Sequence, residues 1–428
     1  YRLEAGLRNN RQSAYKESEK QLQQGIDVLQ ECEDSVSRQR LERDLQTALG
    51  NVLIQNEGPG SGAVSEAFAR AAELSFDRAG EATDSVREFA IKWGQWRTCL
   101  DIPQSKQFVD EMLEIATGGR NADLLLEAYH AQWPTCFYLG QLKHCCAAVK
   151  HGLAIYQEDR HVEHRAFFGG HDTRVCGHGQ AALANWLLGH PDESEMHIHN
   201  AVELARNSDH KPSVAHALDY DVMLSYMMGD KDRTRKIASE LYELSREQKF
   251  PDYLDRARTF LGWCLVHDGE VSPGLKELEC GLANQRQVGT QEDFEVFRGM
   301  HAECLFQAGL IQEAMTEYQQ ALSQASDRSM LYWQGELSRR IGTLAHQLGD
   351  RDLSRFSLLQ AISLNESQGA NNLLRRALKD FIQLFPDEAD GCRKMLGVIY
   401  TDNPRLFDHP DFQGILSSAP PGTSGTDA

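Results

Sequence analysis

The densest group of residues able to bind metal or catalyse a reaction lies between positions 157 and 178. It contains His161, His164, His171, Cys176 and His178. Imidazole nitrogens and thiolates are ligands that zinc prefers, and His161 and His164, three residues apart, could share one helix face. No Cys-x-x-Cys or His-Glu-x-x-His frame fixes their geometry, however. We therefore predict a solvated loop whose histidines cap helices or pack, with no bound metal. A metal-dependent enzyme is the weakest of three alternatives.

Other candidates for chemistry have simpler structural interpretations. The glycine-rich stretch 58–62 lacks the lysine and hydroxyl of a Walker loop and follows a helical pattern, so it predicts a turn between helices. His144, Cys145 and Cys146 are adjacent, but Cys145 falls where a small buried residue is expected. No nucleophile elbow or paired acid and base stands out. We predict that this segment is not an enzyme and has no catalytic residues and no cofactor.

The elements that must position these residues follow a regular spacing of glycines. Gly189, Gly229, Gly269, Gly309 and Gly349 are each 40 residues apart, and each lies in a short polar turn between helical patterns. A fixed period of this size is typical of stacked helical repeats. Seven residues before each glycine, and five and twelve after it, most side chains are small. Nine residues after it they are mostly larger and apolar, as in Ile198 and Leu278.

These columns resemble the tetratricopeptide pattern, with a period of 40 residues in place of 34 and without its closing proline. We therefore predict an all-α fold, a right-handed superhelical solenoid of tetratricopeptide-like helical hairpins. Residues 1–400 would form about nine hairpins with terminal helices, 401–416 an extension packed on the last repeats, and 417–428 a disordered tail.

One insertion interrupts the spacing. Gly140 precedes Gly189 by 49 residues, nine more than the period, and the extra residues fall within 157–173. Loops added to a rigid scaffold often carry function. We therefore take as candidate residues of the insertion and its flank His161, His164, His171, Asp172, Arg174 and His178.

A second candidate site is the concave face of the solenoid. In tetratricopeptide-like stacks the first helix of each hairpin lines this face, and counting back from each glycine gives inward positions. Aromatic residues interleaved with charged ones suit the capture of a peptide, although packing between hairpins is an equal alternative. The predicted groove residues are Trp186, Asp219, Tyr226, Arg256, Trp263, Glu303, Phe306, Arg339 and His346.

Composition narrows the class of partner. The chain has 44 Lys and Arg against 63 Asp and Glu, a net charge of −19, so it lacks the positive charge typical of nucleic-acid binding. This charge favours solubility, with a basic peptide partner as the alternative. Ten dispersed cysteines predict a reduced, cytoplasmic protein, and no apolar run predicts a membrane span. The chain begins at Tyr1 within a helical pattern, so we expect a segment of a longer protein.

Two stretches carry a resemblance to a known family. Phe167–His178, leading into Asn185–Asp192, and Met395–Asp402, leading into Phe407–Asp411, resemble the C-terminal repeat region of large bacterial signalling proteins. Those proteins carry a class III adenylate or guanylate cyclase domain and an AAA or NACHT-type ATPase before the repeats. The resemblance implies a non-catalytic regulatory segment that binds a protein or peptide, including other domains of the same polypeptide. The alternative is an inducer sensor for a small molecule, as in ATPase-type transcription activators.

Overall fold

Each hairpin reverses direction at its turn glycine. In the computed structural model of the protein, Gly140, Gly189, Gly229, Gly269, Gly309 and Gly349 all have φ between +68° and +91°. This left-handed conformation costs glycine little because glycine has no Cβ, so it ends one helix and lets the next begin within a few residues. The structure describes residues 1–12, 14–58, 60–76, 85–287 and 292–407.

The described residues are mostly helical and contain no strand. The helices are α1 (Arg2–Arg11), α2 (Tyr15–Gln30), α3 (Val36–Glu57), α4 (Gly62–Phe76), α5 (Ser85–Thr98), α6 (Ile102–Gly118), α7 (Ala122–Tyr138), α8 (Leu142–Ile155), α9 (Glu158–His161), α10 (Thr173–Leu188), α11 (Pro191–Asn207), α12 (Lys211–Met228), α13 (Lys231–Gln248), α14 (Pro251–His267), α15 (Val271–Gln287), α16 (Phe294–Gln307), α17 (Ile311–Asp327), α18 (Gln334–Gln347), α19 (Arg351–Gln368), α20 (Asn371–Leu384) and α21 (Asp390–Asp402). Short 3-10 helices are η1 (Val162–Ala166), η2 (Pro386–Glu388) and η3 (Pro404–Phe407).

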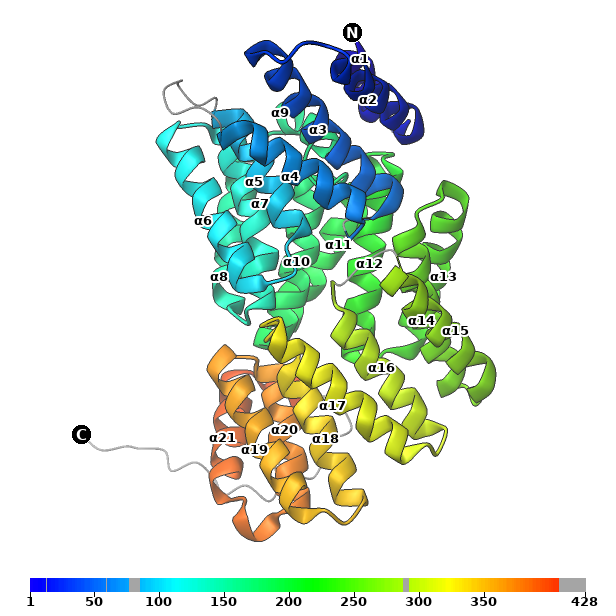
Figure 1. Cartoon of the computed structure of the whole chain (residues 1–428). Coiled ribbons are helices and arrows are strands. Elements are labelled where there is room, and N and C mark those ends of the chain that lie inside the picture. Colours follow the sequence, from blue (N-terminus) through cyan, green and yellow to red (C-terminus); the bar gives the residue numbers. More distant parts are fainter. Residues whose placement is uncertain (13, 59, 77–84, 288–291, 408–428) are drawn as a thin grey trace, which may run out of the picture.

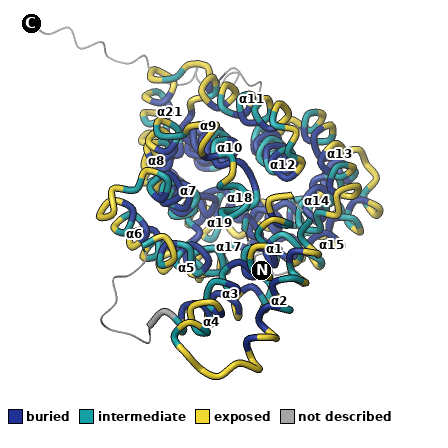
Figure 2. The backbone as a smooth tube through the Cα atoms, turned by 90° about the horizontal axis from the view of Figure 1, so that it is seen from above, coloured by how far each residue is buried: buried dark blue, intermediate teal, exposed yellow. Residues whose placement is uncertain are grey.

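Consecutive helices pack as antiparallel pairs, from α1 with α2 to α20 with α21, and α9 and η1 are inserted between α8 and α10. The pairs stack from one end of the molecule to the other and wind around a common axis (Figures 1 and 2). Seen along that axis, α7, α10, α12 and α14 lie on the inner side of α8, α11, α13 and α15. This arrangement confirms the predicted all-α solenoid of tetratricopeptide-like hairpins.

The small residues of the repeat columns are where helices approach most closely. A Cβ added to Gly262 would lie 2.7 Å from the carbonyl oxygen of Gly274, and one added to Gly274 would lie 2.6 Å from that of Gly262. Ala182, Ala302 and other members of these columns are fully buried. The spacing that identifies the repeat in the sequence is thus the spacing of the contacts between paired helices.

The superhelix is closed by contacts between repeats that are far apart in sequence. The backbone N–H of Leu331 donates to the carbonyl of Tyr138 at 2.6 Å, and the Asn372 amide donates to the carbonyl of Trp186 at 2.8 Å. Arg97 of α5 pairs with Glu292 at 2.7 Å. These contacts hold the C-terminal repeats against the middle of the solenoid.

The beginning of the predicted C-terminal extension packs on two parts of the chain. Leu406 and Phe407 are buried with the last helices, and the Asn403 amide donates to the carbonyl of Gly189. The remainder of the extension and the tail at 417–428 lie outside the described residues. Within the part of the chain that is described, none of the helices is long and apolar enough to cross a membrane. All ten cysteines are free thiols.

Candidate functional site

The first candidate site lies where the insertion meets α7 and α10. Helix α7 places Asp123, Glu127 and His130 at i, i+4 and i+7, on one face. Helix α10 begins at its N-cap Asp172, whose side chain accepts hydrogen bonds from the backbone N–H groups of Arg174 and Val175. This cap sets the start of α10 and therefore the direction of Cys176 on its first turn. The chain between η1 and α10 brings His171 toward both helices.

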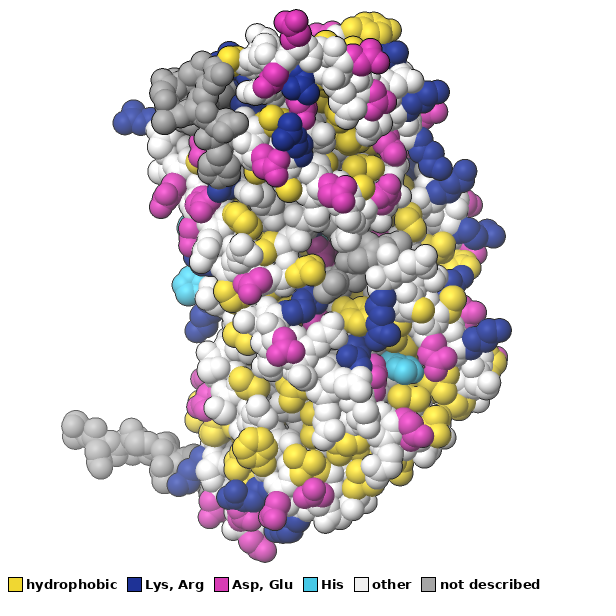
Figure 3. Space-filling view, viewed as in Figure 1, with side chains coloured by type: hydrophobic (Ala, Val, Ile, Leu, Met, Phe, Trp, Pro, Cys, Tyr) yellow, Lys and Arg dark blue, Asp and Glu magenta, His cyan; other side chains and the backbone are white. Residues whose placement is uncertain are grey.

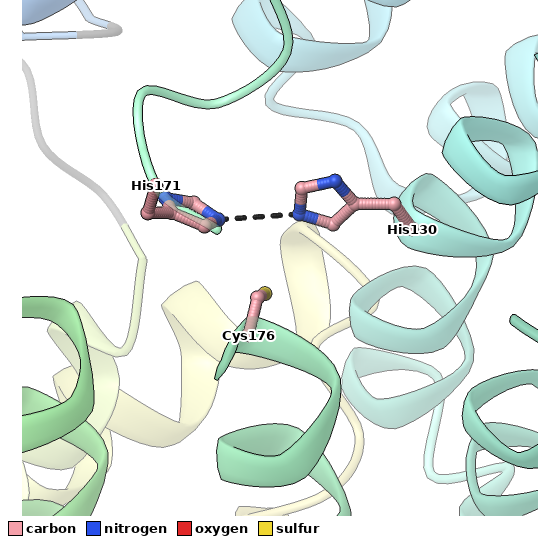
Figure 4. Close-up of side chains that lie close together, drawn as sticks. All are labelled: His130, His171 and Cys176. Atoms are coloured by element: carbon pink, nitrogen blue, oxygen red, sulfur yellow. Dashed lines mark hydrogen bonds between the residues drawn. The ribbon is translucent and has the colours of Figure 1, made fainter. Parts of the chain in front are cut away.

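We define the histidine cluster as Glu127, His130, His171 and Cys176. The Nε2 atoms of His130 and His171 are 3.2 Å apart, and the Cys176 thiol lies beside the gap between the two rings (Figure 4). On the far side of His130, Nδ1 is 2.9 Å from a carboxylate oxygen of Glu127. All four residues are buried, and Glu127 has no exposed surface. Two imidazoles and a thiol therefore converge on one enclosed point.

The charges around this point shift the titration of its members in opposite directions. Although burial disfavours its charged form, Cys176 and Glu127 raise the pKa of His130 to about 9. Burial and the neighbouring His216 lower the pKa of His171 to about 3. Burial disfavours a thiolate, yet the surrounding histidines lower the pKa of Cys176 well below its usual value. The carboxylate of Glu127 contacts His130, and this contact helps to explain why the pKa of His130 is raised whereas that of His171 is lowered.

Glu127 is held by residues from three segments. Its Oε1 is 2.7 Å from Nδ1 of His164 in η1 and accepts a hydrogen bond from the Thr173 hydroxyl at 3.1 Å. Burial opposes ionisation, yet His130 and His164 lower the pKa of Glu127. Removing one of these donors would destabilise the fold, because the buried negative charge of Glu127 would lose a partner.

Aromatic rings enclose the histidine cluster. His130 lies 5.1 Å from both Trp93 and Trp133, measured between ring centroids. The ring of His216 stacks on His171 at 3.6 Å, and the Tyr220 hydroxyl is 3.7 Å from the sulfur of Cys176. The cluster is therefore shielded from solvent on several sides.

The structure brings together three of the six predicted residues of the insertion and its flank. His161 and His164 lie beside Asp123 and Glu127, with their rings 4.9 Å apart, and His171 joins the histidine cluster. His161 ends α9 and His164 lies in η1, so the segment predicted as a loop is partly helical.

The other three residues have different surroundings. Asp172 caps α10 and accepts a hydrogen bond from Tyr156, and Arg174 stacks over the Tyr156 ring. His178 contacts His197 with Nδ1 atoms 2.9 Å apart. The sequence reasoning missed Glu127 and His130, although the spacing of Asp123, Glu127 and His130 on one helix face was a readable signal.

The second candidate site is a cavity of about 390 Å³ on the concave side. We call it the arginine pocket. Its walls come from the end of α12, from α14 and α16, and from α18 and α20. Its lining residues are Tyr226, Met227, Met228, Gly229, Trp263, Glu303, Trp333, Glu336, Arg339, Arg340, Arg375, Arg376, Lys379 and Asp380.

Positive charge exceeds negative charge in the arginine pocket, with five cationic side chains against three carboxylates. Glu336 pairs with Arg339 at 2.6 Å and with Arg340 at 3.0 Å. Arg376 instead donates to the carbonyl oxygen of Met227 at 2.9 Å. Burial, together with the charges of Arg339 and Arg340, lowers the pKa of Arg376 despite the presence of Glu336. An anion would relieve this repulsion.

The predicted groove residues divide between this pocket and the core. Tyr226, Trp263, Glu303 and Arg339 line it, and Trp186 lies under the guanidinium of Arg376 at 5.2 Å. Asp219 and Arg256 form a buried ion pair at 2.7 Å, so they are not groove residues in this structure. Arg256 also pairs with Asp293 of the next hairpin at 3.1 Å. Phe306 packs against the core, and His346 lies 6.3 Å from the Phe385 ring.

Comparisons with known proteins show what the chain is similar to. No family model matches it. An uncharacterized protein of Rhizobium meliloti (strain 1021) is 29% identical over 376 residues, which are 88% of this chain and 36% of that protein. The chain therefore spans about a third of the length of this curated relative.

Two solved structures share the fold. A Rap protein complexed with Competence and Sporulation Factor aligns with a TM-score of 0.62 at 13% identity, covering 86% of this chain and 97% of that chain. NprR in complex with its cognate peptide NprX aligns with a TM-score of 0.53 at 13% identity, covering 84% and 98%. Both are built of tetratricopeptide-like helical repeats. At this identity the likeness shows the fold alone.

Proposed function

We propose that this chain is a non-catalytic binding module that holds an acidic protein or peptide segment in the arginine pocket and so regulates a larger protein. The excess positive charge of the pocket carries this proposal, since the whole chain has a net charge of −19. The Rap protein is in complex with Competence and Sporulation Factor and NprR with its cognate peptide NprX, which supports a peptide as the ligand.

The chemistry of the pocket favours a carboxylate, either a side chain or a chain terminus. Guanidinium groups bind carboxylates through paired, charge-assisted hydrogen bonds. Trp263, Trp333 and Tyr226 supply apolar surface beside the cations for the side chains that flank the carboxylate. The cavity volume falls in the range of about 300–1,000 Å³ typical of ligand sites. Both the charge and the size suit part of a peptide.

The position of the pocket suggests how binding would be transmitted. The Arg376 contact to Met227 joins α20 to the end of α12, across the contact between distant repeats. A ligand that binds Arg376 would bias the equilibrium between closed and more open superhelices by its difference in affinity for the two. The regulated partner would be another protein or another domain of the same polypeptide.

The parent protein is part of this proposal. The resemblance of Phe167–His178 and Met395–Asp402 to cyclase- and ATPase-linked repeat regions favours a cyclase/ATPase signalling protein. The greater length of the Rhizobium relative is compatible with additional domains. Sequencing of the complete reading frame tests this point, and absence of both a cyclase and an ATPase would refute it.

A small-molecule inducer is the second candidate ligand, because the same pocket would accept a small anion such as a nucleotide or an organic acid. The aromatic walls and the cations do not by themselves require a peptide. The two candidates share the pocket and differ only in the size of the ligand.

A binding assay separates these candidates. Acidic peptides with free or amidated C-termini, nucleotides and citrate would be titrated into the chain and followed by calorimetry. We expect binding that is lost in the double variant Arg339→Ala with Arg376→Ala. Arg206→Ala is the matched control, since Arg206 forms an exposed ion pair with Glu240 outside the pocket. Equal binding by the double variant would refute the pocket as the site, and binding of citrate or nucleotides alone would select the inducer sensor.

A further inference from the structure

We propose that His130, His171 and Cys176 are ligands of a structural zinc ion that fastens the insertion to α7 and α10. The ligand atoms of these three residues all lie within 4.8 Å of one another, and all three residues are buried. This inference is independent of the arginine pocket and of any ligand that binds there.

The separation of the nitrogen atoms fits a shared ion. Two Zn–N bonds of about 2.05 Å at the tetrahedral angle place the nitrogens about 3.3 Å apart. The Nε2 atoms of His130 and His171 are 3.2 Å apart, and Cys176 lies beside the line that joins them (Figure 4). Two nitrogens and one sulfur are a ligand set that zinc binds well, with one position left for another donor.

The surroundings of His130 are those of a zinc ligand. Its Nδ1 faces the Glu127 carboxylate at 2.9 Å, which keeps a proton on Nδ1 and directs Nε2 toward His171, where zinc would displace the second proton of the ring. Glu127 is in turn held by His164 and Thr173. A carboxylate behind a metal-binding imidazole orients the ring and makes it a better ligand.

Two further polar side chains, Tyr220 and His216, lie against the proposed ligands Cys176 and His171. The Tyr220 hydroxyl is 3.7 Å from the Cys176 sulfur. Among the described residues, Nε2 of His216 is buried without a hydrogen-bond partner, although Nδ1 of the same ring contacts Tyr253 at 3.0 Å. A water molecule bound to zinc could donate to His216, or Tyr220 could complete the set.

A catalytic interpretation of the same residues fits less well. Cys176, His130 and Glu127 have the order of a nucleophile, a base and an orienting acid. However, Cys176 is 4% exposed, His130 3% and Glu127 0%, so a substrate could not reach the sulfur. A zinc ion needs no such access once the site has folded around it.

The neighbouring group of Asp123, His161 and His164 serves as an internal contrast. Its ligand atoms also lie within 4.8 Å of one another. In His161, however, Nδ1 accepts a hydrogen bond from the backbone N–H of Gln157 and Nε2 donates to Asp123. His161 is thus satisfied as a neutral ring by a backbone N–H and a carboxylate, whereas Nε2 of His130 faces another imidazole nitrogen.

The proposed ion would connect parts of the chain that are distant in sequence. The insertion that carries His171 also contacts α1, through the Asn10 amide and the carbonyl of Ala166, and α3, through Gln55 and the carbonyl of Gly169. Zinc at His171 would thus hold the N-terminal hairpins against the middle of the solenoid.

The test uses the full chain purified without a histidine tag. We expect about one equivalent of zinc by mass spectrometry and, in the cobalt-substituted protein, the visible bands of tetrahedral coordination with a thiolate charge-transfer band. Cys176→Ser and His171→Gln should retain less than about a tenth of an equivalent. His178→Gln is the matched control, since His178 is on the same helix and faces His197.

Two further measurements keep the test decisive if a variant folds poorly. A chelator should lower the melting temperature of the wild-type chain, and added zinc should restore it. Cys176→Asp, which keeps a ligand, should retain zinc but lose the thiolate band. Less than a tenth of an equivalent of zinc in the wild type after reconstitution would overturn the proposal, as would equal zinc in wild type and Cys176→Ser.

Discussion

The histidine cluster and the arginine pocket use nitrogen-bearing side chains in opposite ways. In the cluster, a fully buried carboxylate lies behind His130 and aromatic rings exclude solvent. In the pocket, five cations face three carboxylates around a cavity. On the face drawn in Figure 3, charges of both signs are mixed, without an extended area of one sign. The groups of the cluster thus face one another within the chain, whereas the pocket has an excess of positive charge around a cavity.

This difference follows from how each region is built. The pocket comes from the regular repeat: Glu336 and Arg376 are 40 residues apart, as are Arg339 and Lys379. Stacking brings such columns together automatically. The cluster depends on the insertion, which adds His171 to residues of α7 and α10. The stacked hairpins thus form a surface that extends along the solenoid, whereas the insertion completes one enclosed site.

The largest effect we expect is on stability, at Glu127. Glu127→Ala would leave the donors of His130, His164 and Thr173 without their acceptor in a buried site, so we expect a loss of about 3–5 kcal/mol of unfolding free energy. Urea denaturation followed by circular dichroism measures it. Glu158→Ala is the control, because the Glu158 side chain is 73% exposed in its pair with Arg174. Equal losses in the two variants would mean that the buried contacts of Glu127 contribute no more to stability than the exposed ion pair of Glu158.

The second effect concerns binding at Arg376. Arg376→Gln removes a cation that has no carboxylate contact within the described structure beyond the field of Glu336. We expect an anionic ligand of the pocket to lose about 1.5–3 kcal/mol of binding free energy, because a charge-assisted hydrogen bond disappears. Stability should change little, since repulsion from Arg339 and Arg340 is relieved. Calorimetry measures the binding free energy, and thermal melting measures the stability. A large loss of stability with unchanged binding would show that Arg376 supports the fold and does not bind the ligand.

Sequence reasoning was more successful for the pocket than for the cluster, for a physical reason. The glycine spacing predicts which helix face points inward, and four of the residues on that face, Tyr226, Trp263, Glu303 and Arg339, line the arginine pocket. It could not show that distant repeats close over Asp219 and Arg256, because that depends on the superhelical pitch. The path of an insertion has no period at all. His171 was named, and the shared helix face of Glu127 and His130 was readable, but that these two residues meet a segment 44 and 41 residues later in the chain could be found only from the fold.

A third effect concerns the pH dependence of stability at His210, a histidine whose ring contacts a serine hydroxyl in place of a carboxylate. Burial, and the charge of Arg165, lower the pKa of His210 to about 4, whereas Glu127 helps to raise that of His130. His210 is therefore neutral in the folded chain, while the unfolded chain takes up a proton below its ordinary pKa of about 6.5. Stability should fall as the pH drops from about 6.5 toward 4. We expect about 1–2 kcal/mol at pH 5.

The variant His210→Gln isolates this contribution. It keeps a group able to bond Ser213, which the His210 ring contacts at 2.9 Å, but it does not titrate. Urea denaturation at pH 7 and pH 5 should show a smaller drop in the variant than in the wild type. Parallel pH dependence in both proteins would mean that His210 takes up its proton equally in the folded and unfolded chains.

The smallest effect separates the two regions by ionic strength. Raising the salt concentration from 0.1 M to 1 M shortens the Debye length from about 10 Å to about 3 Å, which weakens interactions with solvent-accessible charges. An anionic peptide in the arginine pocket should therefore bind several-fold more weakly at high salt, whereas zinc at His130, His171 and Cys176 should stay bound because the cluster is buried. Calorimetry and metal analysis on the same samples provide both readouts. If peptide affinity did not depend on salt, the aromatic residues of the pocket would supply the binding energy and the arginines would contribute little. The pocket would then not be an anion site, and this difference from the buried histidine cluster would be lost.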